Sequence, residues 1–265
     1  MTVAVIQFPG SNCEYETLEA LTVVGVDADV VPWNTDDGLL SKYQGFILPG
    51  GFSFQDRVRA GVVSSKLPIL DFIKLKAEEG FPVLGICNGC QILAEAGVLP
   101  DYNQHSSLQM GLAPNMANKG YHGFVCDWVY VKIKHTQASL FTRYFDDTDV
   151  LPIQINHGEG NFKFYNSDLV QNSLATQLLY CDESGDVTLS YPVNPNGSDF
   201  NIAGLCNKSG NVLAMMPHPE RGMFWYHVPR YLHHDLAAQR RDGDLLVGPW
   251  QKMFESLRDY IKETY

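Results

Sequence analysis

The sequence lacks three features that would each point to a different class of protein. None of its apolar runs reaches the roughly 18 residues that a membrane-spanning helix needs. Lysine and arginine number 19 against 30 acidic residues, so the formal net charge is −11, and neither nucleic acid nor an anionic membrane is an expected partner. The six cysteines are scattered, and the N-terminus shows no basic signal-peptide region. These two features predict a reducing, cytoplasmic environment.

The 265 residues are 45% hydrophobic, which is enough for one substantial core without a second domain. Strand and helix signals alternate through the first hundred residues, and each strand is a short apolar run. This pattern predicts a mostly parallel central sheet flanked by helices. The expected strands are 3–8, 28–31, 44–48 and 81–86, and the expected helices are 13–24, 67–79 and 87–96.

The second half of the chain has a different pattern. Apolar residues spaced by two indicate strands at 124–135, 150–155, 161–165, 201–206 and 212–216, and Asn207-Lys-Ser-Gly210 is typical of a hairpin turn. Antiparallel strands are therefore expected to extend the parallel sheet. We predict one domain over 1–265, with an irregular insertion at about 222–249 and a helix over 250–265.

Cys87 is the first candidate for chemistry. It follows an apolar strand and opens a helix, where the positive end of the helix dipole favours a thiolate. Gly85 and Gly89 would permit a tight turn of the kind that presents a nucleophile. A buried structural cysteine is the plain alternative. Cys90 offers another, because Cys-x-x-Cys at a helix start is also a redox motif.

A second group of candidates supplies the partners that a cysteine nucleophile needs. His218 and Glu220 follow a predicted strand, and Pro217 and Pro219 fix the backbone so that both side chains can face one way. Gly50 and Gly51 end another strand, where their backbone N–H groups could stabilise an oxyanion together with that of Asn88. An ordinary turn is the alternative for the two glycines. The spacing fits no standard zinc pattern, so no metal is expected.

Together these motifs give the chain a family resemblance. Gly85-Ile-Cys-Asn-Gly-Cys-Gln91 and His218-Pro-Glu220 resemble the class I glutamine amidotransferases. The chain resembles the glutaminase subunits of phosphoribosylformylglycinamidine synthases more closely still. Five segments carry this resemblance: FPGSNC at 8–13, LPGGFSF at 48–54, HGEG at 157–160, NPNGS at 194–198 and MMPHPER at 215–221.

The resemblance implies a role for each site residue. Cys87 would be the nucleophile, His218 the base and then the acid, and Glu220 the group that orients His218. Gly51 and Asn88 would donate to the oxyanion through their backbones. Gln91 would help to hold glutamine, and the loop around His157 would lie near that pocket.

The resemblance also implies partners. Ammonia released from glutamine would pass to a large synthetase subunit that uses ATP and magnesium, with a small accessory subunit in the complex, and this chain would need no cofactor of its own. Two departures from the family pattern are present: Gln55 stands where glycine is usual, and Cys90 where an aromatic is common. The remaining alternatives are another class I amidotransferase, a thiol-disulfide oxidoreductase that uses Cys87 and Cys90, and a non-catalytic partner-binding subunit.

Overall fold

A nine-stranded sheet forms the centre of the protein. The computed structural model describes residues 2–100, 109–117, 121–166, 170, 175–232 and 247–265. The strands of the sheet are β1 (Thr2–Gln7), β2 (Asp27–Pro32), β3 (Gly45–Leu48), β4 (Val83–Ile86), β8 (Val125–Ile133), β9 (Val150–His157), β11 (Thr176–Cys181), β12 (Ile202–Cys206) and β13 (Val212–Met215).

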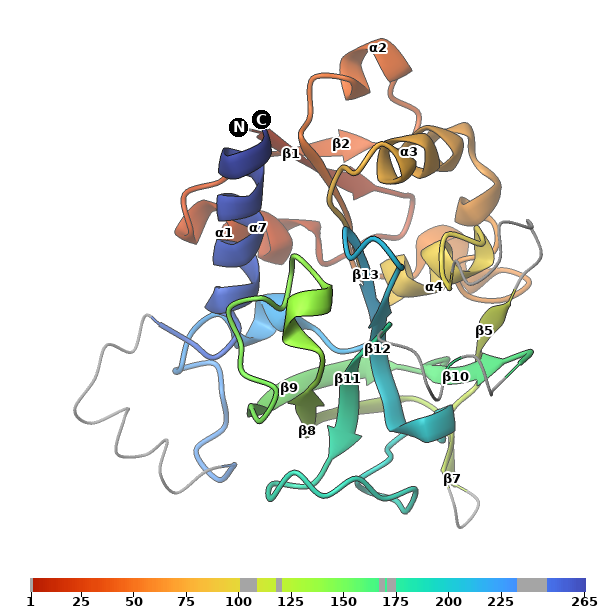
Figure 1. Cartoon of the computed structure of the whole chain (residues 1–265). Helices are drawn as coiled ribbons and strands as arrows, with labels where there is room; N and C mark the ends of the chain where they lie inside the picture. The colour runs from red at the N-terminus through yellow and green to blue at the C-terminus, as the bar shows by residue number, and fades with distance from the viewer. Residues whose placement is uncertain (1, 101–108, 118–120, 167–169, 171–174, 233–246) are drawn as a thin grey trace.

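The order of the strands is β2-β1-β3-β4-β13-β12-β11-β8-β9 (Figure 1). Every pair from β2 to β13 is parallel, and every pair from β13 to β9 is antiparallel. The predicted fold class is therefore confirmed: helices flank a parallel sheet that antiparallel strands extend. The predicted hairpin at Asn207–Gly210 is confirmed as well, because it joins β12 to β13.

Helices cover both faces of the parallel part. They are α1 (Glu14–Val23), α3 (Pro68–Glu78), α4 (Asn88–Glu95) and α7 (Gln251–Thr264), with a short α2 (Asp37–Leu40). In Figure 1, α1 and α7 lie on one side and α3 and α4 on the other. The spacing of apolar residues explains this arrangement, since α7 buries Met253, Phe254, Leu257 and Ile261 on a single stripe. Within the described ranges, no helix is both long and apolar enough to cross a bilayer.

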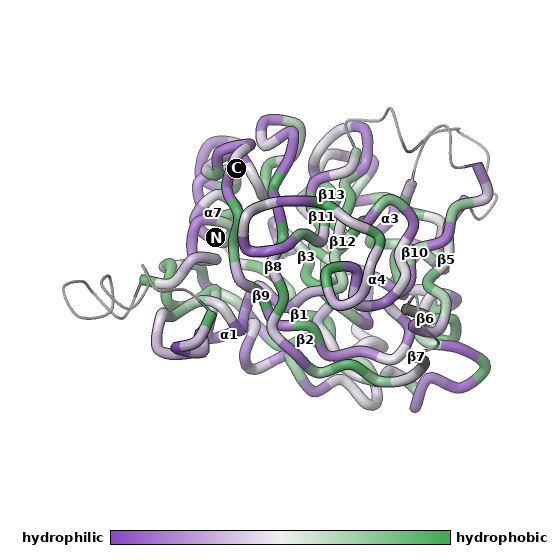
Figure 2. Tube along the Cα trace, turned by 90° about the horizontal axis from the view of Figure 1, so that it is seen from below, coloured by the Kyte–Doolittle hydropathy of each residue, from purple (hydrophilic) through white to green (hydrophobic). Residues whose placement is uncertain are grey.

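The central strands read as continuous apolar runs because both faces of the sheet are covered. All residues of β3, β4, β12 and β13 are buried. Figure 2 shows the hydrophobic colour on the strands at the centre and the hydrophilic colour mostly around the outside.

Four loops meet at the carboxyl edge of the parallel strands. Phe52 N–H, after β3, donates to Gly10 O, after β1, at 2.9 Å. Cys87 N–H, after β4, donates to Met215 O, the last residue of β13, at 2.8 Å. Parallel strands end at one edge of a sheet, where sites in open α/β folds form. The breaks at Pro9-Gly10, Pro49-Gly50-Gly51 and Cys87 thus lie at one edge of the sheet, where the sequence predicts a site.

One strand lies elsewhere than expected. β10 (Asn161–Phe164) does not extend the large sheet but pairs with β5 (Met110–Ala113), a strand that the sequence pattern did not indicate, and β6 (Met116–Ala117) pairs with β7 (Tyr121–His122). The turn after β9 explains the difference, because Asn115 Oδ1 accepts the N–H of Gly160 at 2.9 Å and draws the chain away from the large sheet. β11 was not predicted either.

The two ends of the predicted insertion at about 222–249 lie together. Gly248 N–H donates to Met223 O at 2.8 Å, and Trp250 N–H donates to Gly222 O at 3.3 Å. The chain near 248–250 therefore lies beside the residues at 222–223, where the segment begins. Residues 233–246 of this segment, including His233, His234 and Asp235, lie outside the described residues.

Candidate active site

Cys87 lies at a strained turn between β4 and α4. Its φ of 52° and ψ of −105° are unusual for a residue with a side chain, and such strain is typical of nucleophile turns. Gly85 and Gly89 are required because a side chain at either position would clash with a neighbouring residue. A Cβ on Gly89 would overlap the backbone carbonyl of Leu48, and one on Gly85 would lie 2.6 Å from Leu93 Cδ1. The glycines on either side of the cysteine therefore serve close packing of α4 on the sheet.

His218 and Glu220 form a buried pair beyond the end of β13. His218 Nδ1 lies 2.6 Å from Glu220 Oε1, and both side chains are at most 1% exposed. Burial works to lower the pKa of His218, but the Glu220 carboxylate and the nearby Cys87 thiol raise it well above its usual value. His218 Nε2 has no hydrogen-bond partner among the described residues, so it is available to exchange a proton with a thiol.

A small cavity of about 100 Å³ reaches Cys87. Asn156 O lies 3.6 Å from the sulfur on one side of it. Eleven residues line the cavity: Gly51, Phe52, Asp56, Ala60, Cys87, Gln91, Phe124, Asn156, His157, Gly158 and Glu159. Phe52 and Phe124 stack at 6.2 Å between ring centroids and are 40% and 48% exposed, so they mark its outer end.

The two glycines expected near an oxyanion have different surroundings. Gly51 lines the cavity, whereas Gly50 does not. A Cβ on Gly50 would lie 2.7 Å from His218 Cε1 and 3.0 Å from Cys13 Sγ. Gly50 therefore lets the His218 ring approach the backbone. Asn88, the third residue expected near the oxyanion, begins α4 directly after Cys87.

Both polar atoms of the Gln91 side-chain amide make hydrogen bonds within the protein. Its Nε2 donates to Glu159 O at 2.7 Å, and its Oε1 accepts from Asn88 Nδ2 at 2.9 Å. Asn88 Oδ1 in turn accepts the N–H of Ser53 at 3.1 Å. Gln91 thus lines the cavity and ties α4 to the loop after β9.

His157 lies at the end of β9 and is buried. Its Nδ1 is 3.2 Å from Asn115 Oδ1, and its Nε2 has no partner among the described residues. Burial, with a smaller effect from His218, lowers the pKa of His157 to about 3, so the ring is neutral at physiological pH. Gly160 is needed because any Cβ there would overlap this ring.

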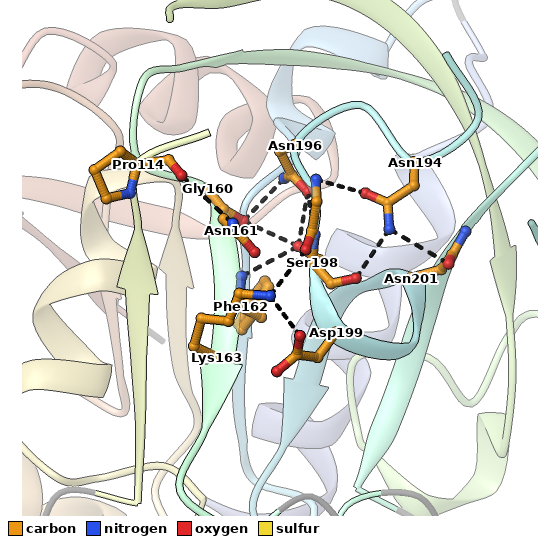
Figure 3. A network of polar contacts seen from close by, with 11 residues as sticks. Pro114, Gly160, Asn161, Phe162, Lys163, Asn194, Asn196, Ser198, Asp199 and Asn201 are labelled. Carbon is orange, nitrogen blue, oxygen red and sulfur yellow. Dashed lines mark hydrogen bonds and ion pairs between the residues drawn. The ribbon is translucent and has the colours of Figure 1, made fainter. Parts of the chain in front are cut away.

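A buried polar network fixes the loop that follows His157. Figure 3 shows Asn196 and Ser198 converging on Gly160, with Asn196 Nδ2 donating to Gly160 O at 2.9 Å and Ser198 Oγ donating to the same oxygen at 3.2 Å. Asn194 Nδ2 closes the network on Ser198 O at 2.9 Å. The segment 194–198, which the sequence marked as distinctive without giving it a task, holds the cavity wall in place.

Sequence reasoning missed Cys13 and the task of Arg221. Arg221 Nη2 donates to Cys13 Sγ at 3.2 Å, and Arg221 Nε donates to Glu16 Oε2 at 2.8 Å. Cys13, His218 and Glu220 place ligand-type atoms within 4.8 Å of one another. The guanidinium on the sulfur and the hydrogen bond between His218 and Glu220 already use these atoms, which disfavours a metal there. The FPGSNC motif at 8–13 was the signal that could have indicated Cys13.

Cys90 does not line the cavity that reaches Cys87. It is fully buried in α4, and burial raises its pKa well above the usual value, with a smaller contribution from Cys87. In a redox Cys-x-x-Cys only the first, attacking thiol must ionise readily. The oxidoreductase interpretation is disfavoured instead because it gives no role to the buried His218–Glu220 pair.

Comparison with known proteins agrees with this geometry. A family model described as a CobB/CobQ-like glutamine amidotransferase domain matches residues 1–261. A glutamine amidotransferase from Thermotoga maritima has a similar fold, with a TM-score of 0.53 at 16% identity over 100% of this chain and 99% of that one. The fold and the family model thus define the class as glutamine amidotransferase.

Relatives with higher sequence identity identify the family within this class. The phosphoribosylformylglycinamidine synthase subunit PurQ of Methanothrix thermoacetophila is 39% identical over 271 residues, or 99% of both chains. The PurQ of Pyrococcus horikoshii is 42% identical over 82% of this chain and 87% of its own length. The structure of PurLQS from Thermotoga maritima matches with a TM-score of 0.71 and 31% identity over 98% of both chains. This chain belongs to the PurQ family.

Proposed function

We propose that this chain is the glutaminase subunit of a phosphoribosylformylglycinamidine synthase. It would hydrolyse glutamine to glutamate and ammonia and pass the ammonia to a synthetase partner, which forms formylglycinamidine ribonucleotide in purine biosynthesis. Membership of the PurQ family supports the reaction. The observation that carries the mechanism is the buried His218–Glu220 pair, at 2.6 Å, beside the strained Cys87 turn.

Each member of the triad has a defined task in this proposal. The Cys87 thiolate attacks the side-chain amide carbon of glutamine, while the backbone N–H groups of Gly51 and Asn88 face the developing oxyanion. His218 then gives a proton to the departing ammonia, and a γ-glutamyl thioester remains. Glu220 holds the His218 ring through Nδ1 and stabilises its protonated form.

The second half of the reaction uses the same histidine. His218 takes a proton from water, which attacks the thioester carbon and releases glutamate and the Cys87 thiol. Ammonia that escaped to bulk water would become protonated and would cease to be a nucleophile. It therefore needs a protected route to the acceptor site.

The partners follow from the relatives. The Thermotoga maritima structure is named for PurL, PurQ and PurS together, and we propose the same kind of assembly here, with a large synthetase subunit and a small accessory subunit. ATP and magnesium are assigned to the synthetase, and the complex to the cytoplasm. We further propose that the whole chain is a single domain and that the segment at about 222–249 docks a partner, so that its deletion weakens assembly.

Ammonia release from glutamine tests this function. It would be measured with and without the synthetase partner, for the wild type, Cys87→Ser and Cys90→Ser. We expect activity to be lost only in Cys87→Ser, and the free chain to be slower than the complex. Equal loss in both variants, or no turnover even in the complex, would contradict the proposal.

A further inference from the structure

Cys90 lies three residues after the proposed nucleophile and has no task in the proposed reaction. It does not line the cavity at Cys87, and its side chain is completely buried in α4. Every residue of α4 is buried, so Cys90 faces the interior of the fold, where no substrate reaches it. A thiol at this place either fills space or acts on Cys87 itself.

The backbone places Cys87 and Cys90 in the first turn of one helix. Cys87 is the N-cap of α4, and its carbonyl accepts the N–H of Gln91 at 3.1 Å. This bond closes the first turn of the helix, and Cys90 lies within that turn. Helix geometry puts Cα atoms three residues apart at about 5 Å. That separation lies inside the range of about 4.4–6.8 Å that a disulfide spans.

The two thiols also interact electrostatically. Burial raises the pKa of Cys90 well above its usual value, and the charge of Cys87 contributes to the rise. Such a contribution is felt between groups that lie near one another inside a fold. The raised pKa keeps Cys90 protonated at physiological pH, so its proton is available to a group that leaves Cys87.

The cavity determines which oxidants can reach Cys87. Its volume is about 100 Å³. One water molecule needs about 10–15 Å³ of such space, so hydrogen peroxide fits easily. Oxidised glutathione does not fit, since pockets for ligands of drug size measure about 300–1,000 Å³. Peroxide oxidises a nucleophilic thiol to a sulfenic acid, and a second oxidation to the sulfinic acid is generally irreversible.

Cys13 is the other thiol near His218, and its sulfur is already engaged. It accepts from Arg221 Nη2 at 3.2 Å and donates to Asn12 Oδ1 at 3.1 Å, and a disulfide with Cys87 would break both contacts. Cys90 is a free thiol that makes no such contact among the described residues. The surroundings therefore favour Cys90 over Cys13 as the partner of an oxidised Cys87.

We propose that Cys90 is a resolving thiol, which forms a reversible disulfide with oxidised Cys87 and so switches the glutaminase off without destroying it. Hydrogen peroxide gives one oxygen to the Cys87 sulfur, and the other leaves as water. The Cys90 sulfur then attacks the Cys87 sulfenic acid, the S–S bond forms, and the hydroxyl leaves with the Cys90 proton as a second water. Peroxide is thus reduced and the two sulfurs are oxidised. The inference rests on the proposed function, because it assigns regulation to the proposed nucleophile.

The disulfide and the proposed reaction exclude each other. Glutamine turnover needs the Cys87 sulfur free in the cavity, whereas the disulfide holds it against α4. In a reducing compartment a disulfide of this kind is transient and redox-sensing. Ammonia release would therefore stop under peroxide and resume when thiol reductants return, whereas a sulfinic acid at Cys87 would be a permanent loss.

Peptide mapping tests the linkage directly. The reduced complex would be treated with hydrogen peroxide, alkylated with iodoacetamide without reduction, and digested with trypsin. Cys87 and Cys90 fall in one tryptic peptide, 77–119, which contains no other cysteine. We expect this peptide to lose two hydrogens and both alkylation sites in the wild type, and to regain both sites after dithiothreitol.

Recovery of activity tests the consequence. Ammonia release would be measured before peroxide, after prolonged peroxide and after dithiothreitol, for the wild type, Cys90→Ser and Cys90→Ala. Peroxide should inactivate all three at similar rates, because the first step takes place at Cys87. Dithiothreitol should restore at least about five-fold more activity to the wild type than to either variant, in which Cys87 continues to the sulfinic acid. Cys206→Ser, which removes a similarly buried thiol in β12, should recover as the wild type does.

Three results would overturn the inference. The first is a wild-type peptide in which Cys87 carries a sulfinic acid while Cys90 is alkylated. The second is a linkage of Cys87 to Cys13, and the third is equal recovery of the wild type and both Cys90 variants. Failure of the untreated wild-type complex to release ammonia would instead overturn the proposed function, and the peptide map would still report whether the linkage forms.

Discussion

The two sides of His218 balance their charges in different ways. Near a separate cavity of about 410 Å³, Glu16 of α1 pairs with Arg221 at 2.8 Å, and Arg221 also contacts Cys13. At the cavity that reaches Cys87, Asp56 and Glu159 have no cation within 4 Å among the described residues. The acidic residue of the first group is thus held in a salt bridge, whereas the two carboxylates that line the cavity at Cys87 have no ion-pair partner among the described residues.

The backbone is regular around Glu16 and unusual around Asp56. Glu16 lies in the regular helix α1, whereas Asp56 lies in a turn with several positive φ angles. Strain is unfavourable for stability and is retained where geometry matters. Glu220, the hydrogen-bond partner of His218, is tested first, and a residue from each side follows.

Glu220→Gln should cause the largest loss. The amide can still accept from His218 Nδ1, but it no longer supplies the charge that raises the pKa of His218. We expect kcat for ammonia release to fall on the order of 10²- to 10⁴-fold with little change in KM. The alkaline limb of the pH–rate profile should also move to lower pH. A loss of less than ten-fold would show that Glu220 is not needed to orient the base.

Cys13→Ala tests the balanced side. The substitution removes the sulfur that packs beside His218 and accepts from Arg221, so the ring has more freedom to move. We expect about a ten-fold fall in kcat. Cys206→Ala is the matched control, because Cys206 is equally buried at 1% exposure but lies in β12. Both variants should lose about 1 kcal/mol of stability from the small cavity; equal kcat values in the two would remove Cys13 from the mechanism.

Asp56→Asn should make the protein more stable at neutral pH. The pKa of Asp56 is about 6 in the folded protein against an ordinary value of 3.8, so the folded state binds this proton more tightly than the unfolded state. The carboxyl therefore lowers stability as the pH rises from about 4 to 6, and its removal restores that stability above pH 6. Because Asp56 is partly exposed, we expect a gain of only about 1 kcal/mol.

Chemical denaturation at pH 4 and pH 7.5 measures this effect. Wild type and Asp56→Asn should differ at pH 7.5 and coincide at pH 4. Glu16→Gln, which removes one partner of the Arg221 salt bridge, should lower stability or leave it unchanged at pH 7.5. The contrast between Glu16 and Asp56 would be wrong if Asp56→Asn also lowered the free energy of unfolding at pH 7.5.

Much of this structure could be predicted from sequence, and the parts that could not share a physical cause. The strands of the parallel part and the nucleophile turn follow from local signals, namely apolar runs and the glycines around Cys87, whereas the order of the strands in the sheet does not. The contact of Cys13 with His218 joins residues some two hundred positions apart, and no local pattern encodes it. β10 was assigned to the wrong sheet because side-chain contacts of Asn115 determine its direction.

Gln55→Gly should have the smallest effect and tests the strained turn directly. Gln55 stands where the resembled family usually has glycine, and its φ of 61° explains why glycine is suited there. Removing the Cβ should relieve strain and raise the free energy of unfolding by about 0.5–1 kcal/mol. The extra entropy that glycine gives the unfolded chain reduces this gain. Gln55→Ala keeps the Cβ and is the control, with no expected gain. If both variants had the same unfolding free energy, the strain would not reside at Gln55, and the geometry of Asp56 would depend on its contacts with Asn88 and the Phe54–Pro9 hydrogen bond alone.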